Sequence, residues 1–269
     1  MATNGLLVGA AAGPILTIPL LLPLLAQSWR LDLVVWASPV LLTAVLFLEL
    51  RRRGTSGAML AVAAAASGAM STGDHRRSTS RWWPDWTNPL IWLLGFTFGS
   101  NNALYFGTAA FLPEYLASIG RSDLTGAALG FLTGSQFIAS ALLLATAELL
   151  HRRVWPYLVF GLGTVVAVLA IALASGMWII LAGATLLGFS LAVTFVITLA
   201  LPAALSAPGE VHRMSAGMFT ISYGLAVIVP VVCGALWDLT AQPWTAFVPL
   251  GLCASALTVL GVVLSVRHR

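Results

Sequence analysis

Long apolar stretches with almost no charge dominate the chain. Of its 269 residues, 59% are hydrophobic and only 8% are charged, whereas soluble domains carry roughly 25% charged residues. A run of about 20 apolar residues is long enough to cross a bilayer as an α-helix. The sequence therefore predicts an all-α, polytopic membrane helix bundle with eight transmembrane helices, over Gly5–Gln27, Leu33–Leu50, Pro89–Leu112, Thr125–Leu150, Pro156–Ala174, Met177–Leu205, Met214–Leu236 and Trp244–Val266.

The arginines indicate how these helices are oriented. Arg supplies all 13 basic residues, and only Arg30 and Arg121 lie outside the segments that follow the second, fourth, sixth and eighth predicted helices. Because positive residues favour cytoplasmic loops, we expect a multi-pass protein of the cell (inner) membrane with both termini cytoplasmic. The apolar segment Ser56–Met70 is short for a membrane span, and we assign it to a cytoplasmic loop.

A short internal repeat divides the chain. Ala26–Trp29 reads AQSW and Ala241–Trp244 reads AQPW, and each joins two predicted helices on the external side. Chance or convergent loop chemistry is the alternative explanation for so short a match. A parallel repeat is one organisation of membrane transporters. The long polar segment after the second predicted helix separates two predicted helices from six. Together with the repeat, it divides the chain into the last two helices of an amino-terminal bundle (1–50), a cytoplasmic linker (51–87) and a six-helix carboxyl-terminal bundle (88–269).

Two stretches carry a resemblance to a known family. The first is YFGTAAFLPEYLASIG, Tyr105–Gly120. The second, Ser215–Trp244, ends in a Gly-x-x-x-Asp-x-Thr turn made by Gly234, Asp238 and Thr240. In these residues the chain resembles the major facilitator superfamily, and within it the cyanate/nitroimidazole porter group. The resemblance implies a major facilitator fold lacking its first four helices, so that the eight helices match helices five to twelve. A natural eight-helix protein is the alternative.

The same resemblance implies the activity. It points to a secondary active transporter that moves a small polar solute or anion across the membrane by alternating access. An inactive or structural truncated fragment is the alternative, because a central cavity needs both bundles. The implied partners are a small-molecule substrate and the lipid bilayer, with a coupling proton as a further candidate. No charged residue lies at the centre of a predicted helix. Proton-coupling residues would therefore belong to the missing helices, or this half acts without one.

A cytoplasmic loop of the family has a degenerate counterpart here. The family pattern is Gly-x-x-x-Asp-Arg-x-x-Arg, and Glu148, Arg152 and Arg153 keep an acid and two arginines at similar spacing without the glycine. The resemblance implies that these three residues help to gate the cytoplasmic side. The alternative is an ordinary surface pair between Glu148 and Arg152, four residues apart on a helix.

Polar side chains inside the apolar stretches are the candidate substrate-binding residues. Amides and phenols are costly in hydrocarbon unless they face other helices or a wet cavity. Asn101 and Tyr105 share a helix face, whereas Asn102 points about 100° away from Asn101. Interhelical hydrogen bonding is the alternative role for all such groups. The candidate set is Asn101, Asn102, Tyr105, Gln136, Ser222 and Tyr223.

Motifs for catalysis and cofactor binding are missing from the sequence. It has no nucleophile paired with a base, no HExxH and no phosphate-binding loop. Cys233 and Cys253 lie inside apolar runs, without a CxxC motif or a Cys/His cluster. We therefore expect neither an enzyme nor a cofactor or metal site. The arginines are dispersed over short loops, so we expect no nucleic-acid partner.

Overall fold

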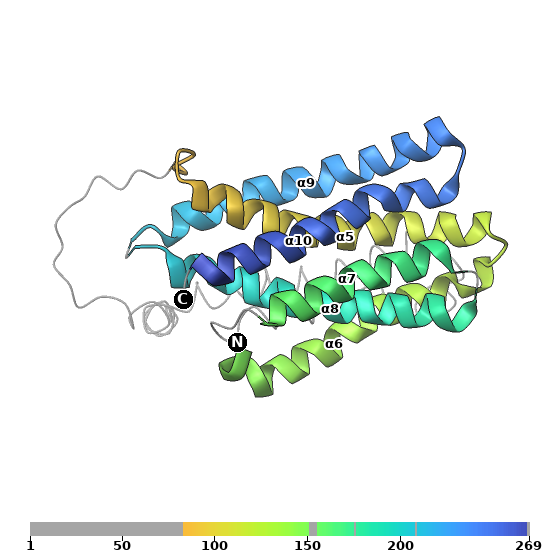
Figure 1. Ribbon diagram of the computed structural model, residues 1–269, viewed down its shortest axis with the longest axis horizontal. Helices are drawn as coiled ribbons and strands as arrows, with labels where there is room; N and C mark the ends of the chain where they lie inside the picture. The colour runs from red at the N-terminus through yellow and green to blue at the C-terminus, as the bar shows by residue number, and fades with distance from the viewer. Residues whose placement is uncertain (1–82, 151–154, 175, 208, 268–269) are drawn as a thin grey trace, which may run out of the picture. The chain divides into compact units, whose positions relative to one another are not determined.

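Every secondary-structure element that the structure describes is a helix. The computed structural model describes residues 83–150, 155–174, 176–207 and 209–267, all within one compact unit. The predicted helices over 5–27 and 33–50, and nearly all of the predicted linker, lie outside these residues. The elements are α5 (Pro89–Ser118), η2 (Ser122–Leu124), α6 (Thr125–Leu150), α7 (Trp155–Leu173), α8 (Met177–Leu205), α9 (Val211–Thr240), η3 (Pro243–Ala246) and α10 (Phe247–Arg267), shown in Figure 1.

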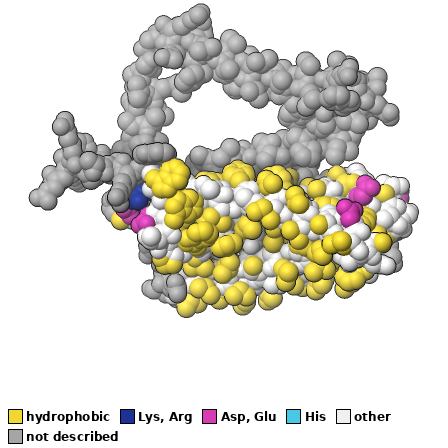
Figure 2. Space-filling model, turned by 90° about the horizontal axis from the view of Figure 1, so that it is seen from above, with side chains coloured by type: hydrophobic (Ala, Val, Ile, Leu, Met, Phe, Trp, Pro, Cys, Tyr) yellow, Lys and Arg dark blue, Asp and Glu magenta, His cyan; other side chains and the backbone are white. Residues whose placement is uncertain are grey.

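Five segments of this bundle are long and apolar enough to cross a membrane, by length and composition. They are Ser122–Leu143, Trp155–Leu173, Met177–Leu205, Val211–Thr240 and Pro243–Leu264. They agree with the last five helices predicted from the sequence and support a helical membrane protein. Figure 2 shows one flank of the described part, on which hydrophobic side chains are widespread and charged ones lie near the two ends. Such a surface suits contact with lipid rather than with water.

The helix α5 differs from the prediction in length and in character. Its start has the features that commonly begin a helix: Asn88 Oδ1 accepts a hydrogen bond from the Leu90 amide at 2.9 Å, and Pro89 follows directly. It ends at Ser118, six residues beyond the predicted Leu112, because Tyr115 and Leu116 continue its buried face past Pro113. The polar middle of α5 keeps it out of the five apolar segments above.

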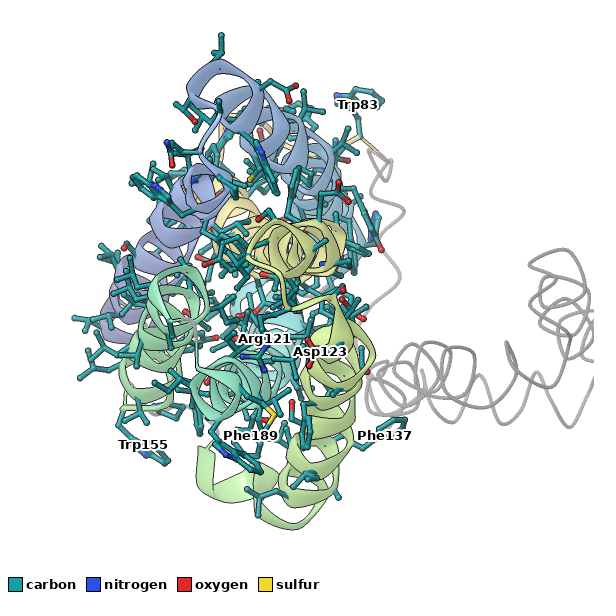
Figure 3. The ribbon with its side chains drawn as sticks, turned by 90° about the vertical axis from the view of Figure 1, so that its right-hand side faces the viewer. Trp83, Arg121, Asp123, Phe137, Trp155 and Phe189 are labelled. Carbon is teal, nitrogen blue, oxygen red and sulfur yellow. The ribbon has the colours of Figure 1, made fainter. Side chains whose placement is uncertain are left out.

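The position of α5 inside the bundle explains how it tolerates this polarity. It packs most extensively against α9, then against α10 and α8, and it also contacts α6. The end-on view in Figure 3 places it among these helices, whereas Trp155 points away from the bundle. All residues from Thr97 to Leu104 are buried, which is more than two consecutive turns of helix without an exposed face. A helix buried all round is surrounded by protein.

Glycines allow the closest helix approaches. At Gly188, in α8, an added methyl group would collide with the Leu132 carbonyl oxygen of α6. At Gly99, in α5, it would lie 3.1 Å from the Ser222 Cα of α9. Small residues at such contacts are the usual means by which membrane helices pack closely. The α6–α8 and α5–α9 contacts therefore depend on these two positions.

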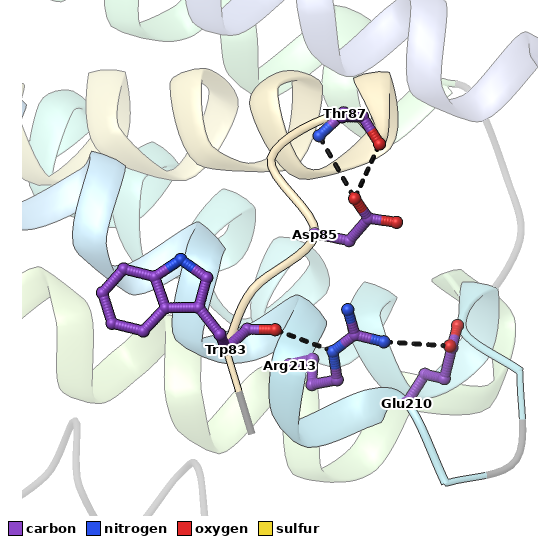
Figure 4. Close-up of polar contacts among 5 residues, drawn as sticks. All are labelled: Trp83, Asp85, Thr87, Glu210 and Arg213. Carbon is purple, nitrogen blue, oxygen red and sulfur yellow. Dashed lines mark hydrogen bonds and ion pairs between the residues drawn. The ribbon is translucent and has the colours of Figure 1, made fainter. Parts of the chain in front are cut away.

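A small polar cluster links the segment before α5 to the start of α9. Figure 4 shows that Arg213 Nε donates to the Trp83 carbonyl at 2.8 Å, while its terminal nitrogen lies 3.2 Å from Glu210 Oε1. Next to it, Asp85 accepts hydrogen bonds from the Thr87 amide and hydroxyl, at 3.3 and 2.6 Å. Arg121 and Asp123 form a 3.5 Å ion pair after the other end of α5. The charged side chains named here thus lie at the two ends of the bundle.

The close approach at Gly188 gives a stability prediction. Gly188→Ala should destabilise the protein by about 1–3 kcal/mol, because the methyl group forces α6 and α8 apart. The matched control is Gly130→Ala in α6, where an added methyl group meets no atom within 4 Å. Alanine favours a helix, so this control should not lower stability. Thermal unfolding of the purified protein in detergent, followed by tryptophan fluorescence, measures both. Equal midpoints for the two variants would contradict the packing described here.

Candidate functional site

The described bundle contains a cavity of about 350 Å³ beside the middle of α5. This volume lies at the lower end of the range typical of small-molecule sites. Four helices contribute to its wall, so the cavity depends on their mutual packing. Its lining consists of Phe98, Asn101, Asn102, Tyr105 and Phe106 from α5, Gln136 from α6, Leu191, Ala192, Phe195 and Leu199 from α8, and Phe219 and Tyr223 from α9.

The structure brings most of the sequence-predicted site residues together here. Five of the six candidates line the cavity, and the sixth, Ser222, is fully buried in α9 against one of them. Asn101 and Asn102 are 2% and 7% exposed, so both amides are withdrawn from lipid and bulk water. Tyr223 is 57% exposed and lies at the edge of the group. The residues are thus close in space, and their binding role stays a prediction.

Both asparagines also bond neighbouring helices. Thr194 Oγ1 of α8 lies 2.7 Å from Asn101 Oδ1 and 2.9 Å from the Ser190 carbonyl of its own helix, so its one hydrogen is shared between these two acceptors. Asn102 Nδ2 donates to Ser222 Oγ of α9 at 2.8 Å. These bonds tie α5 to two different partners at one level of the bundle. The interhelical role considered for these residues is therefore present, alongside their place in the cavity wall.

A second polar pair lies on the α6 side of the cavity. Tyr105 of α5 and Gln136 of α6 both line this side of the cavity. Gln136 Nε2 also lies 3.5 Å from the Leu132 carbonyl of its own helix, which is at the long limit for a hydrogen bond. Two further hydroxyls of α6 do not join them: Thr133 bonds the Leu129 carbonyl at 2.7 Å, and Ser140 lines no part of the cavity.

Aromatic rings make up half of the lining, and sequence reasoning missed most of them. Phe98 meets Phe195 at 4.9 Å and Phe219 at 5.4 Å between ring centroids, and Phe219 stacks with Tyr223 at 6.1 Å. These contacts join α5, α8 and α9 through a continuous aromatic wall. A phenylalanine inside an apolar run carries no signal that separates a cavity wall from lipid contact or core. Thr194 was likewise not predicted, because threonine often bonds its own helix.

The lining has no charged side chain. Within the described ranges, no three His, Cys, Asp or Glu residues gather in a way that could hold a metal ion. The chemistry that the cavity offers is therefore that of neutral hydrogen-bonding groups set between aromatic faces. Such a lining suits a polar solute with flat apolar surfaces.

The predicted gating residues cannot be placed. Arg152 and Arg153 lie outside the described residues, and so does the side chain of Glu148 near the end of α6. The proposed pairing between them stays a prediction.

No protein-family model, curated protein or solved structure matches this chain. The resemblance to the major facilitator superfamily therefore rests on the sequence stretches quoted above.

The bond between Asn102 and Ser222 can be measured through a double-mutant cycle of Asn102→Leu and Ser222→Ala. We expect a coupling energy of about 0.6–1.7 kcal/mol, the range found for polar pairs between membrane helices. Thr220→Ala replaces Ser222→Ala in the control cycle, because Thr220 bonds only the Ala216 carbonyl, at 2.9 Å. Unfolding free energies in detergent give both cycles. Equal coupling in the two cycles would show that the α5–α9 bond does not form.

Proposed function

We propose that this chain belongs to a secondary transporter that carries a small, uncharged polar solute across a membrane by alternating access. The observation that supports it is the cavity at the middle of α5, whose wall combines amides, phenols and aromatic rings from four helices. Polar groups at this depth of an apolar bundle are costly, and in membrane proteins they usually mark a pathway. The resemblance to the major facilitator superfamily points in the same direction.

The position of the cavity along the helices suits one state of such a cycle. Its lining comes from the middle of α5, mainly the second half of α8, and the first half of α9. Because α9 follows α8 after a short connection and runs in the opposite direction, these two halves lie at the same end of the bundle. The cavity is thus displaced toward the end of the bundle that holds Arg213. The distribution of arginines assigns this end to the cytoplasm. We therefore propose that the cavity is nearer the cytoplasmic side.

A structural role is the second candidate. The bonds from Asn101 to Thr194 and from Asn102 to Ser222 would hold the helices together even in a chain that transports nothing. In that case the two amides serve packing alone, and the chain is an inactive or structural fragment. The two candidate functions predict different effects on uptake when a polar cavity residue that makes no hydrogen bond to α8 or α9 is replaced.

Tyr105 and Gln136 provide this test. In proteoliposomes, uptake of radiolabelled cyanate, a nitroimidazole and uracil is compared between the unaltered protein, Asn101→Ala, Tyr105→Phe and Gln136→Ala. For a transported probe, each variant should lower the initial rate about tenfold, because each removes a hydrogen bond in a desolvated site. The control is Thr185→Val in α8, whose hydroxyl bonds only the Leu181 carbonyl, at 2.8 Å. Uptake no faster than in empty vesicles for all three probes would favour the structural role.

The orientation gives a separate prediction. Cysteines are introduced as His212→Cys, at the Arg213 end, or as Ser122→Cys, at the other end; both positions are exposed. The background carries Cys233→Ala and Cys253→Ala. In intact cells, a membrane-impermeant maleimide should label Ser122→Cys and should label His212→Cys only after the cells are opened. The reverse pattern would show that the Arg213 end faces outward.

A further inference from the structure

We propose that the cavity recognises a planar, uncharged ring that carries both an N–H donor and a carbonyl acceptor, as in a cyclic amide or imide. This rests on the proposed function, since it names the substrate class of the same site. The inference comes from the way the two adjacent asparagines of α5 are oriented. Each uses one end of its amide to bond a neighbouring helix, and the two use opposite ends.

Asn101 supplies a donor. Its Oδ1 accepts from Thr194 Oγ1 at 2.7 Å, a length typical of a bond between two oxygens. This bond uses one of the two lone pairs of the amide oxygen, whereas the whole NH₂ group is left for the cavity that the residue lines. The buried polar atoms that lack a partner in the described part are all hydroxyl oxygens, so this NH₂ group is not sealed inside the protein.

Asn102 supplies an acceptor. Its Nδ2 donates to Ser222 Oγ at 2.8 Å, which fixes the amide in the opposite sense and leaves Oδ1 for the cavity. An amide has two donor hydrogens and two acceptor lone pairs, so a single interhelical bond leaves capacity for a ligand. Thr194 and Ser222 thus act as positioning residues, because they decide which end of each amide a ligand meets.

The rest of the lining restricts the ligand further. The Phe98, Phe195 and Phe219 rings form an apolar wall that favours a flat molecule able to pack against it. No lining side chain is charged, so an ion would lose its hydration without gaining a counter-charge. The volume of about 350 Å³ admits a single ring with its substituents. A small inorganic anion such as cyanate carries a charge and has no flat ring to pack against this wall.

The proposal is tested by binding to the purified protein in detergent, which does not depend on transport. Equilibrium dialysis compares radiolabelled uracil with its derivative methylated at both ring nitrogens, which keeps the ring and both carbonyls but lacks the donors. Uracil should bind at least tenfold more tightly, because the derivative leaves Asn102 Oδ1 unpaired in a desolvated site. Sodium cyanate should not displace uracil. Equal affinity for the two ring compounds, or displacement by cyanate, would overturn the proposal.

Two variants of Thr194 test its role in orienting Asn101. Thr194→Ser keeps the hydroxyl that orients Asn101 and should keep uracil affinity, whereas Thr194→Val removes it and should weaken uracil binding about tenfold. Thr185→Val is the control on the same helix, and the melting temperature of each variant shows that it folds. Uracil affinity equal in Thr194→Ser and Thr194→Val would overturn the role assigned to Thr194.

The outcomes separate this inference from transport. Selective uracil binding without uptake into proteoliposomes would refute the proposed transporter and leave the cyclic-amide site standing. Uptake of another probe, with no preference for uracil over its dimethyl derivative, would refute the cyclic-amide site and leave the transporter standing.

Discussion

Two adjacent amides at the centre of an apolar bundle set the main constraint on this structure. An amide that meets hydrocarbon without a partner costs several kcal/mol, by order of magnitude. The helix that carries Asn101 and Asn102 must therefore lie inside the bundle, and hydroxyls must meet it there. Thr194 of α8 and Ser222 of α9 do so, at 2.7 and 2.8 Å. The burial of every residue from Thr97 to Leu104, and the close α5–α9 packing at Gly99, follow from the same need.

Structural bonding and ligand binding are usually treated as competing explanations for polar residues in membrane helices. In the proposed site the two roles are complementary. A side-chain amide that bonded nothing would rotate, and a ligand would have to fix its orientation at an entropic cost. An amide held at one end by a neighbouring helix presents its other end in a fixed sense, which is the preorganisation that binding sites need. In the proposed site, the interhelical bonds would therefore prepare the cavity wall for a ligand.

The sequence predicts the helices well where apolar length alone decides them. The predicted Thr125–Leu150 and Met177–Leu205 match α6 and α8 residue for residue. The prediction of helix bounds is less accurate where the ends of a helix are polar. The helix α9 begins at Val211 and ends at Thr240, whereas the predicted helix was Met214–Leu236, because hydropathy falls before the helix stops. The polar half of the cavity was predictable, since Asn101, Tyr105 and Gln136 stand out in apolar runs. Its aromatic half and the Thr194 partner were not, because they are defined by tertiary contacts among residues with ordinary local sequence.

The proposed transporter needs no charged residue to couple occupancy to a change of shape. An empty cavity exposes the Asn101 donor and the Asn102 acceptor, which water satisfies as long as the cavity is open. Closing the empty cavity would strip that water and leave both groups unpaired, at a cost of about 1–3 kcal/mol each. A ligand that pairs with both removes this cost and thereby favours the closed state, whereas a ligand that pairs with one removes only part of it. The two neutral amides on α5 would then act both as the recognition element and as the barrier against closing on an empty site.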